Sequence, residues 1–310
     1  HHPQVTRVAA FPNDNPDHNL RAANAAHVYV KPTTQERELG HLIGRTVGLQ
    51  ARLGTEKLIA FAGSLQRIPS VPRVYAELRS VMSNPDFDLE AVANVLHRDP
   101  GLIVKVLQVV NSAFYGLRQR ISDLHHAVAL MGSATISTLV LGISLHDQFA
   151  VLGAARRALD EEWHRALAVA DAAKRIAEAE HVGSETVEEA YLAGLLHNVG
   201  RLVLASNLSD RFTALEWPAD RSELIAIERS AFGAGHPELG GLLLGTWGLD
   251  DALVEAVAFY AEPAKSFGTR FSPLTALHVA VGLSPGTKNF VDEAYLESLG
   301  LPVDRDHGHE

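Results

Sequence analysis

Apolar residues recur every three or four positions along most of this chain, which is the spacing of one face of an α-helix. In the segment "GLIVKVLQVVNS", for example, Leu102, Val106 and Val110 fall along one such face. No convincing alternation of apolar and polar residues, the pattern typical of strands, lies between turn signals. Residues 1–32 show no sustained period and predict an irregular arm. The pattern therefore predicts an all-α protein.

Residues that favour helix starts divide this pattern into separate helices. Asp99 is a strong N-cap candidate, because Pro100 suits the first helical position, where no N–H is needed. Further candidate starts are Thr33 with Glu36, Asp88, Thr186 with Glu189, Ser222, His236, Asp250 and Ser272. We expect the polar segment 153–162 to connect two helical halves.

Breaks in the pattern suggest how the chain is divided. Two prolines in "IPSVPR" interrupt the helical spacing, so we place the start of the main domain just before this segment. The expected parts are an N-terminal arm with a helical extension at 1–65, the main domain at 66–285 (halves at 66–152 and 153–285) and a C-terminal tail at 286–310.

Composition is ordinary for a soluble globular protein and narrows the choice of partners. Of 310 residues, 46% are apolar and 21% charged, and no apolar run is long enough to span a bilayer. Because no signal peptide is recognisable, we expect a cytoplasmic protein with no membrane partner. Without cysteine, any metal would need His, Asp, Glu or Asn ligands. The net charge of −10 argues against a nucleic-acid partner and leaves a protein or a small molecule.

Three histidines in the second half, His164, His197 and His236, are candidates for a metal site, because imidazole nitrogens bind first-row transition metals. In "LAGLLHNVGRLVL", Asn198 follows His197, whereas Asp at this position would suggest a metal-dependent phosphohydrolase. Asn offers only a neutral oxygen, and the loss of a charge beside a dication costs roughly several kcal/mol. A histidine near a helix end is also commonly a cap or a satisfied polar group, so spacing alone leaves both interpretations open.

Other polar and aromatic residues have simpler interpretations. The pair His146–Asp147 follows an apolar helix, and no further ligand lies at a recognisable spacing from it. His97, His125 and His126 stand beside capping signals and are predicted to lie at the surface or in caps. We expect the tryptophans to belong to the core: Trp163, Trp217 and Trp247.

Six separated motifs follow one another along the main domain. In order, they are "IPSVPRVYAEL", "DPGLIVKVLQVVNSAFYG", "ISDLHHAVALMG", "WHRALAVADAAKRIA", "AYLAGLLHNVGRLVL" and "HPELGGLLLGTWGL". Together they resemble the HDOD domain, a mainly bacterial branch of the HD phosphohydrolase superfamily, over roughly residues 66–285. The resemblance implies a smaller helical half packed on a bundle similar to the HD phosphohydrolase core. It also implies a regulatory or signal-transduction role, since this family is regarded as mostly non-catalytic.

The resemblance further implies where a vestigial site lies. His164 matches the first His ligand of the superfamily, and His197 matches the His of its His–Asp doublet. Asn198 replaces the Asp of that doublet, and Val281 stands where a terminal Asp ligand is expected. His236 matches a further His of related proteins.

Both acidic positions of the implied site are therefore lost. Tyr260 and Ala261 also stand where relatives often have a pair of histidines. Without an anionic ligand, neither a strongly bound divalent metal pair nor an activated hydroxide is expected. We accordingly expect no catalytic residue, no metal and no cofactor.

The block that opens with Asp99 and Pro100 closes with Asn111 and Ser112. The side chains of Asn111 and Ser112 can form hydrogen bonds with backbone groups that have no helical partner at the end of the helix. The following residues, "AFYG", can form a turn that packs the two halves together. Direct contact with a partner is the alternative interpretation.

Three functions are compatible with these features. The leading one is a non-enzymatic signalling module that binds a protein partner, with the first 65 residues as a docking or homodimerisation element. The alternative is a metal-dependent phosphohydrolase that acts on a nucleotide or cyclic dinucleotide through the three histidines and Asn198. The third is a cleft that binds a nucleotide anion through these histidines and Arg201. Arg201 can share a helix face with His197, provided that the helix runs through Gly200.

Overall fold

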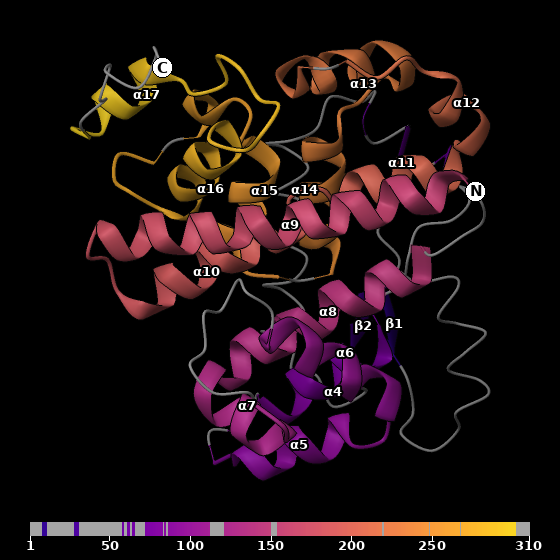
Figure 1. Ribbon diagram of the computed structural model, residues 1–310, viewed down its shortest axis with the longest axis vertical. Helices are drawn as coiled ribbons and strands as arrows, with labels where there is room; N and C mark the ends of the chain where they lie inside the picture. Colours follow the sequence, from indigo (N-terminus) through magenta and orange to yellow (C-terminus); the bar gives the residue numbers. More distant parts are fainter. Residues whose placement is uncertain are drawn as a thin grey trace.

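The structure is a computed structural model that describes residues 8–10, 28–30, 72–111, 121–149 and 154–301, apart from residues 83, 85, 219, 248 and 267, together with several positions between 58 and 65. The expected all-α fold is confirmed, with the helices in two halves (Figure 1). The first half contains α4 (Arg73–Met82), α5 (Leu89–Leu96), α6 (Pro100–Val110), α7 (Leu124–Met131) and α8 (Ser133–Phe149). The second half contains α9 (Ala154–Ala179), α10 (Ser184–Leu196), α11 (Val199–Asn207), α12 (Ser209–Ala214), α13 (Leu224–Phe232), α14 (His236–Thr246), α15 (Asp251–Phe259), α16 (Pro273–Gly282), α17 (Glu293–Ser298) and two short 3₁₀ helices, η2 (Arg221–Glu223) and η3 (Pro263–Lys265).

Side-chain caps define the helices of the first half. The carboxylates of Asp88 and Asp99 accept from backbone N–H groups at the starts of α5 and α6, at 2.7 and 3.0 Å, which confirms both as N-caps. Asn111 ends α6, and its Nδ2 donates to the carbonyl oxygens of Leu107 and Ile121, each at 2.7 Å. Its Oδ1 accepts from the backbone N–H of Ile121, so Asn111 ties α6 to the segment before α7. Ser112 and the "AFYG" segment lie outside the described residues.

The second half is built along α9, a helix of 26 residues that spans the width of the molecule in Figure 1. We expected 153–162 to be a polar connection, but α9 already begins at Ala154. The expectation is wrong because "AARRALDEE" consists almost entirely of strong helix formers. The predicted capping box of Thr186 and Glu189 is wrong as well, since α10 begins at Ser184 without a side-chain cap. The predicted box of Thr33 and Glu36 lies outside the described residues.

The N-terminal arm contains two short strands that we did not predict. Strand β1 (Val8–Ala10) pairs in parallel with β2 (Val28–Val30), with Val8 opposite Val28. The expectation of an irregular arm is therefore wrong for these two segments. The sequence of β2, "VYV", consists of β-branched and aromatic residues, which favour extended backbone when they find a neighbouring strand.

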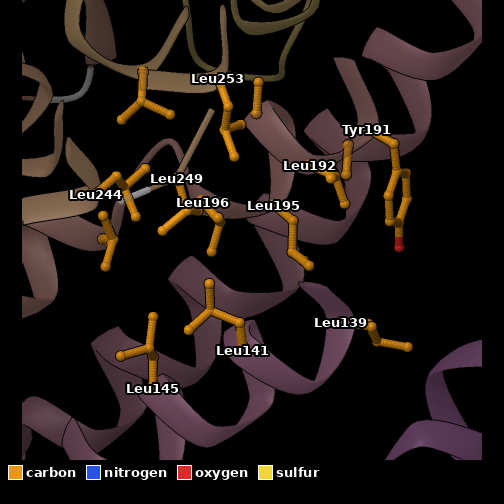
Figure 2. Packing of buried hydrophobic residues seen from close by; sticks show 14 of the residues in the cluster. Leu139, Leu141, Leu145, Tyr191, Leu192, Leu195, Leu196, Leu244, Leu249 and Leu253 are labelled. Carbon is orange, nitrogen blue, oxygen red and sulfur yellow. The ribbon is translucent and has the colours of Figure 1, made fainter. Parts of the chain in front are cut away.

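A continuous apolar core joins the two halves. Figure 2 shows Leu141 and Leu145 of α8 near Leu195 and Leu196 of α10, and all four leucines are almost fully buried. Each such side chain stabilises the folded chain by about 2 kcal/mol through the loss of apolar surface from water. The first half is therefore fastened to the second mainly through α8.

The described fold continues past residue 285, where we expected a C-terminal tail. Asp292 caps α17 by accepting from the N–H of Tyr295 at 3.0 Å. The hydroxyl of Tyr295, which is buried, lies 2.8 Å from that of Thr275 on α16. Residues 286–301 are thus packed against the second half.

The described helices are short or interrupted by polar residues compared with a membrane-spanning segment. None of these described helices is by itself long and apolar enough to cross a membrane. The segments Leu124–Met131 and Ser133–Asp147 reach that length and composition only as a pair, and they are bent by 114° at their junction.

Candidate functional site

A cavity of about 30 Å³ lies in the second half, beside the junction of α10 and α11. This volume holds about two water molecules. Three of the predicted site residues, His197, Asn198 and His236, line the cavity. Charged residues that we did not predict line it too: Glu162, Arg165 and Arg221.

The residues His197 and Asn198 form a turn between α10 and α11. Nδ2 of Asn198 donates to the carbonyl oxygen of Glu162 at 2.9 Å, which ties the turn to α9. Asn favours such breaks because its side chain competes with the helical hydrogen bonds of the backbone. Gly200 lies within α11, but the helix is broken at His197 and Asn198, so His197 and Arg201 do not share one continuous helix face.

Two glycines bring neighbouring helices against this turn. A Cβ atom on Gly194 would lie 2.4 Å from the Cα atom of Ala170 on α9. A Cβ atom on Gly200 would lie 2.1 Å from the carbonyl oxygen of His236 at the start of α14. Only glycine permits these close approaches, and they set the position of His236 relative to the turn.

The Glu162 carboxylate is the centre of a buried ionic cluster. Nη2 of Arg221 lies 2.6 and 2.9 Å from its two oxygens, and Nε of Arg201 lies 3.6 Å from one of them. Burial disfavours the ionised carboxylate, but the positive charges of Arg201 and Arg221 outweigh it and lower the pKa of Glu162 to about 2. Glu162 is therefore ionised at neutral pH, although only 7% of its surface is exposed.

A second buried carboxylate, Glu228, connects this cluster to His236. It accepts from Nη1 of Arg201 at 3.0 Å and from the backbone N–H of His236 at 2.9 Å, and it lies 2.5 Å from Nδ1 of that histidine. Burial raises the pKa of Glu228, but His236 and Arg201 lower it by a larger amount, so the pKa lies below its ordinary value. Nε2 of His236 lies 2.5 Å from the hydroxyl of Tyr260, so both ring nitrogens have partners.

His197 is a neutral imidazole in this environment. Burial lowers its pKa to about 4, because a charged ring would lose its hydration. Its Nδ1 lies 2.7 Å from the carbonyl oxygen of Gly194, which can only accept, so Nδ1 carries the hydrogen. The ring of Tyr260 meets it edge-on, with 5.7 Å between centroids, and burial raises the pKa of that tyrosine well above its ordinary value.

The structure does not bring His164 to the cavity. Glu162, Arg165 and Val169 line it, at the spacing of one face of α9, whereas His164 is exposed on another face of the same helix. This corrects the assignment of His164 to the vestigial site. Arg165, the next residue, takes its place.

Arg201 is not available for the anion-binding role that we considered for it. Its guanidinium pairs with Glu228 and Glu162, and only 6% of the residue is exposed. The guanidinium carbon also lies 4.2 Å from the ring centre of Trp217 and 5.1 Å from that of Phe212. The role of Arg201 is therefore structural.

The remaining positions implied by the resemblance are apolar or neutral. Val281 and Tyr260 line the cavity, and Ala261 packs partly buried against the core. His278, which we did not predict, is fully buried, and its Nδ1 lies 2.7 Å from the carbonyl oxygen of Tyr260. Its Nε2 accepts from the backbone N–H of Asp292 at 2.8 Å, so His278 fastens the segment before α17.

The residues at the cavity do not fit a divalent metal ion. The carboxylates of Glu162 and Glu228 are held by arginines, and both ring nitrogens of His236 are used. Arg165 and Arg221 add positive charge to the wall. In the part of the chain that the structure describes, no group of three His, Asp or Glu side chains could hold a metal ion.

The charged cluster was missed because its members have no local signature. Glu162 and Arg165 flank the boundary of a segment that we took for a connection, and Arg221 and Glu228 lie far along the chain. The one usable signal was a helical spacing, which places Glu162, Arg165 and Val169 on one face of the helix.

The simpler interpretations of the other histidines agree with their contacts. Asp147 pairs with Nζ of Lys105 at 2.5 Å, and the ring of His146 lies 5.5 Å from that of Trp163. Nδ1 of His97 lies 2.8 Å from a carbonyl oxygen of its own helix. His125 and His126 are exposed. The tryptophans belong to the core or pack against it, as predicted: Trp163, Trp217 and Trp247.

Comparisons with known proteins agree with this fold. A protein of Treponema pallidum (strain Nichols), described as uncharacterized, is 26% identical over 242 residues. The match covers 75% of this chain but only 45% of that protein, so the chain spans less than half the length of this relative.

Solved structures of similar fold come from bacteria as well. A protein from Shewanella amazonensis SB2B, provisionally named a metal-dependent phosphohydrolase, has a TM-score of 0.60 and 24% identity, over 86% of this chain and 93% of that one. An HDOD domain protein of unknown function from Geobacter sulfurreducens has a TM-score of 0.60 and 21% identity, over 83% and 84%. These likenesses show the fold alone. The family model of the HDOD domain matches residues 68–263, and this chain belongs to the HDOD domain family.

Proposed function

We propose that this chain is a non-enzymatic regulatory module that acts in signal transduction by binding a protein partner. One observation carries the proposal: the potential metal ligands at the cavity already have other partners. Glu162 and Glu228 bind arginines, and His236 binds Glu228 and Tyr260. A metal-activated hydroxide needs free anionic ligands, and these groups are already neutralised. Membership of the HDOD family supports a regulatory role. We also propose that the protein forms a homodimer in the cytoplasm and that its main domain spans residues 66–285.

The competing function is a metal-dependent phosphohydrolase, which the provisional name of the Shewanella protein suggests for that protein. In this chain it would have to use His197 and the neutral oxygen of Asn198, in a cavity that Val281 also lines. Among the described residues at the cavity, Glu162 and Glu228 are both paired with arginines and are not free to bind such a metal.

Turnover assays separate the two functions. The purified full chain is incubated with Mn²⁺, Fe²⁺ or Mg²⁺ and a phosphodiester, a nucleotide or a cyclic dinucleotide, beside the variant His197→Ala. We expect no release of phosphate or nucleotide above the rate of the variant. Metal-dependent turnover that falls at least tenfold (about 1.4 kcal/mol) in the variant would establish the competing function instead.

The interaction itself needs a direct measurement. A protein that is retained by the full chain must be purified and must bind it in a two-component titration by calorimetry. Saturable binding in the absence of any turnover is the expected result. If no retained protein binds the purified chain directly, the proposed mode of action is wrong.

A further inference from the structure

The cavity contains one charged group whose hydrogen-bonding capacity is largely unused. Arg165 lies on α9 and is half-buried, and its Nε is buried without a hydrogen-bond partner among the described residues. Its Nη1 donates to the carbonyl oxygen of Pro285 at 3.2 Å. A buried N–H group without a partner is rare in folded proteins and commonly indicates a bound water or ion.

The charges around the cavity do not balance. Arg201 and Arg221 share the carboxylate of Glu162, and Arg201 also pairs with Glu228. Two carboxylates thus face three guanidinium groups, and no ion pair is formed by Arg165 among the residues that the structure describes. Burial and the charges of Arg221 and Arg201 lower the pKa of Arg165 by more than Glu162 and Glu161 raise it, so its charged form is only partly compensated. A single negative charge would restore the balance.

The size of the cavity restricts what can supply this charge. A volume of about 30 Å³, which holds about two water molecules, admits the oxygen atoms of an oxyanion head group, whereas a whole nucleoside would have to remain outside. The planar guanidinium of an arginine suits such a group, because it offers paired N–H donors to carboxylate or phosphate oxygens.

We propose that Arg165, with Arg221 beside it, binds a singly charged oxyanion head group, a carboxylate or a phosphodiester, in this cavity. The proposal rests on the proposed non-enzymatic function, since the head group is bound there and not converted. It replaces the role that we considered for Arg201, whose guanidinium is already paired.

The Nε–H resonance of Arg165 reports directly on this contact. The full chain is labelled with ¹⁵N, and the resonance is assigned as the one that is missing from the spectrum of Arg165→Gln. Its chemical shift is then followed during titration with acetate, dimethyl phosphate or sulfate. Chloride keeps the ionic strength constant. We expect a saturable shift with acetate or dimethyl phosphate and a weaker response to sulfate, which carries two charges.

Thermal unfolding with the same anions provides the comparison between variants. The matched control is Arg175→Gln, which removes an exposed arginine from the same helix. The anion should stabilise the wild-type chain and the control alike, because a ligand of the folded state raises the Tm. In Arg165→Gln the apparent affinity should fall roughly tenfold or more, as is usual when a charged hydrogen bond is lost.

Two outcomes would overturn the proposal: no saturable response to any of the anions, or equal responses in wild type and Arg165→Gln. If that variant does not fold, Arg165→Lys takes its place, since it keeps the charge but not the paired donors. Unchanged affinity in Arg165→Lys would also overturn it. A preference for acetate or for dimethyl phosphate identifies the class of head group. Because turnover is measured separately, failure of binding and failure of the non-enzymatic function are distinguishable.

Discussion

At the scale of single residues, Glu162 connects the charged cluster to the turn beside the cavity. Its carboxylate lies between Arg201 and Arg221, and the backbone carbonyl of the same residue holds Asn198. One residue therefore pairs with both arginines and positions the turn at His197 and Asn198.

Removing the charge of Glu162 should destabilise the protein strongly. In Glu162→Gln, Arg201 and Arg221 lose a buried counter-ion, and we expect the free energy of unfolding to fall by roughly 3 kcal/mol. Urea denaturation at pH 7 measures this change. The control is Glu161→Gln, at an exposed position on the same helix, where a change within about 0.5 kcal/mol is expected. Equal stability of the two variants would show that the ion pairs contribute little.

His197 should make the protein less stable in mild acid. Its pKa is about 4 in the fold against an ordinary 6.5, so the unfolded chain takes up the proton first. The free energy of unfolding should therefore decrease as the pH falls from 6.5 towards 4, by up to roughly 3 kcal/mol from this group.

The contribution of His197 is isolated by comparison with His197→Gln, which cannot titrate. Urea denaturation of both proteins at several pH values between 7 and 4 gives the two slopes. The wild-type slope should be the steeper one. Parallel curves would mean that the ring is accessible to protons in the folded state.

At the level of elements, the junction of α10 and α11 depends on close backbone contact. Gly200 lies against the start of α14, so the fold of the turn and the position of His236 are coupled.

Substitution of Gly200 should therefore be costly. In Gly200→Ala the added Cβ would meet a backbone oxygen at 2.1 Å, and we expect a loss of roughly 3 kcal/mol of stability. Gly183→Ala is the matched control, because a Cβ there meets nothing within 4 Å and its φ of −62° suits alanine. Thermal unfolding should show a change of less than about 1 kcal/mol for the control. Similar losses for both variants would contradict the packing argument.

At the level of the whole molecule, the two halves share one apolar core. Leu141 and Leu145 of the first half are buried against leucines of the second (Figure 2). Such a shared interface favours unfolding of both halves together.

Cooperative unfolding can be tested with two probes. All three tryptophans lie in the second half, so their fluorescence reports on that half, whereas far-UV circular dichroism reports on both. The two urea transitions should coincide. Leu141→Ala should lower stability by roughly 3 kcal/mol, against less than about 1 kcal/mol for the exposed Leu89→Ala. Separate transitions in the wild-type chain would show that the halves fold independently.

The sequence determined the helical fold, several of its caps and three residues of the cavity. Periodic apolar positions and local signals such as Asp88 and Asp99 depend on neighbours within a few residues, so they can be recognised without tertiary contacts. His197, Asn198 and His236 were likewise found from their motifs, and the structure brings them to one cavity.

Only the tertiary structure decided which charges meet there. The cluster joins Glu162 to Arg221 across 59 positions of the chain, a pairing that no local pattern specifies. The same contacts exclude His164, since its helix turns it outward, and among the described residues they leave Arg165 outside the ion pairs that Glu162 and Glu228 form. Helix formation is a property of neighbouring residues, whereas the balance of buried charge belongs to groups that meet only after the chain has folded.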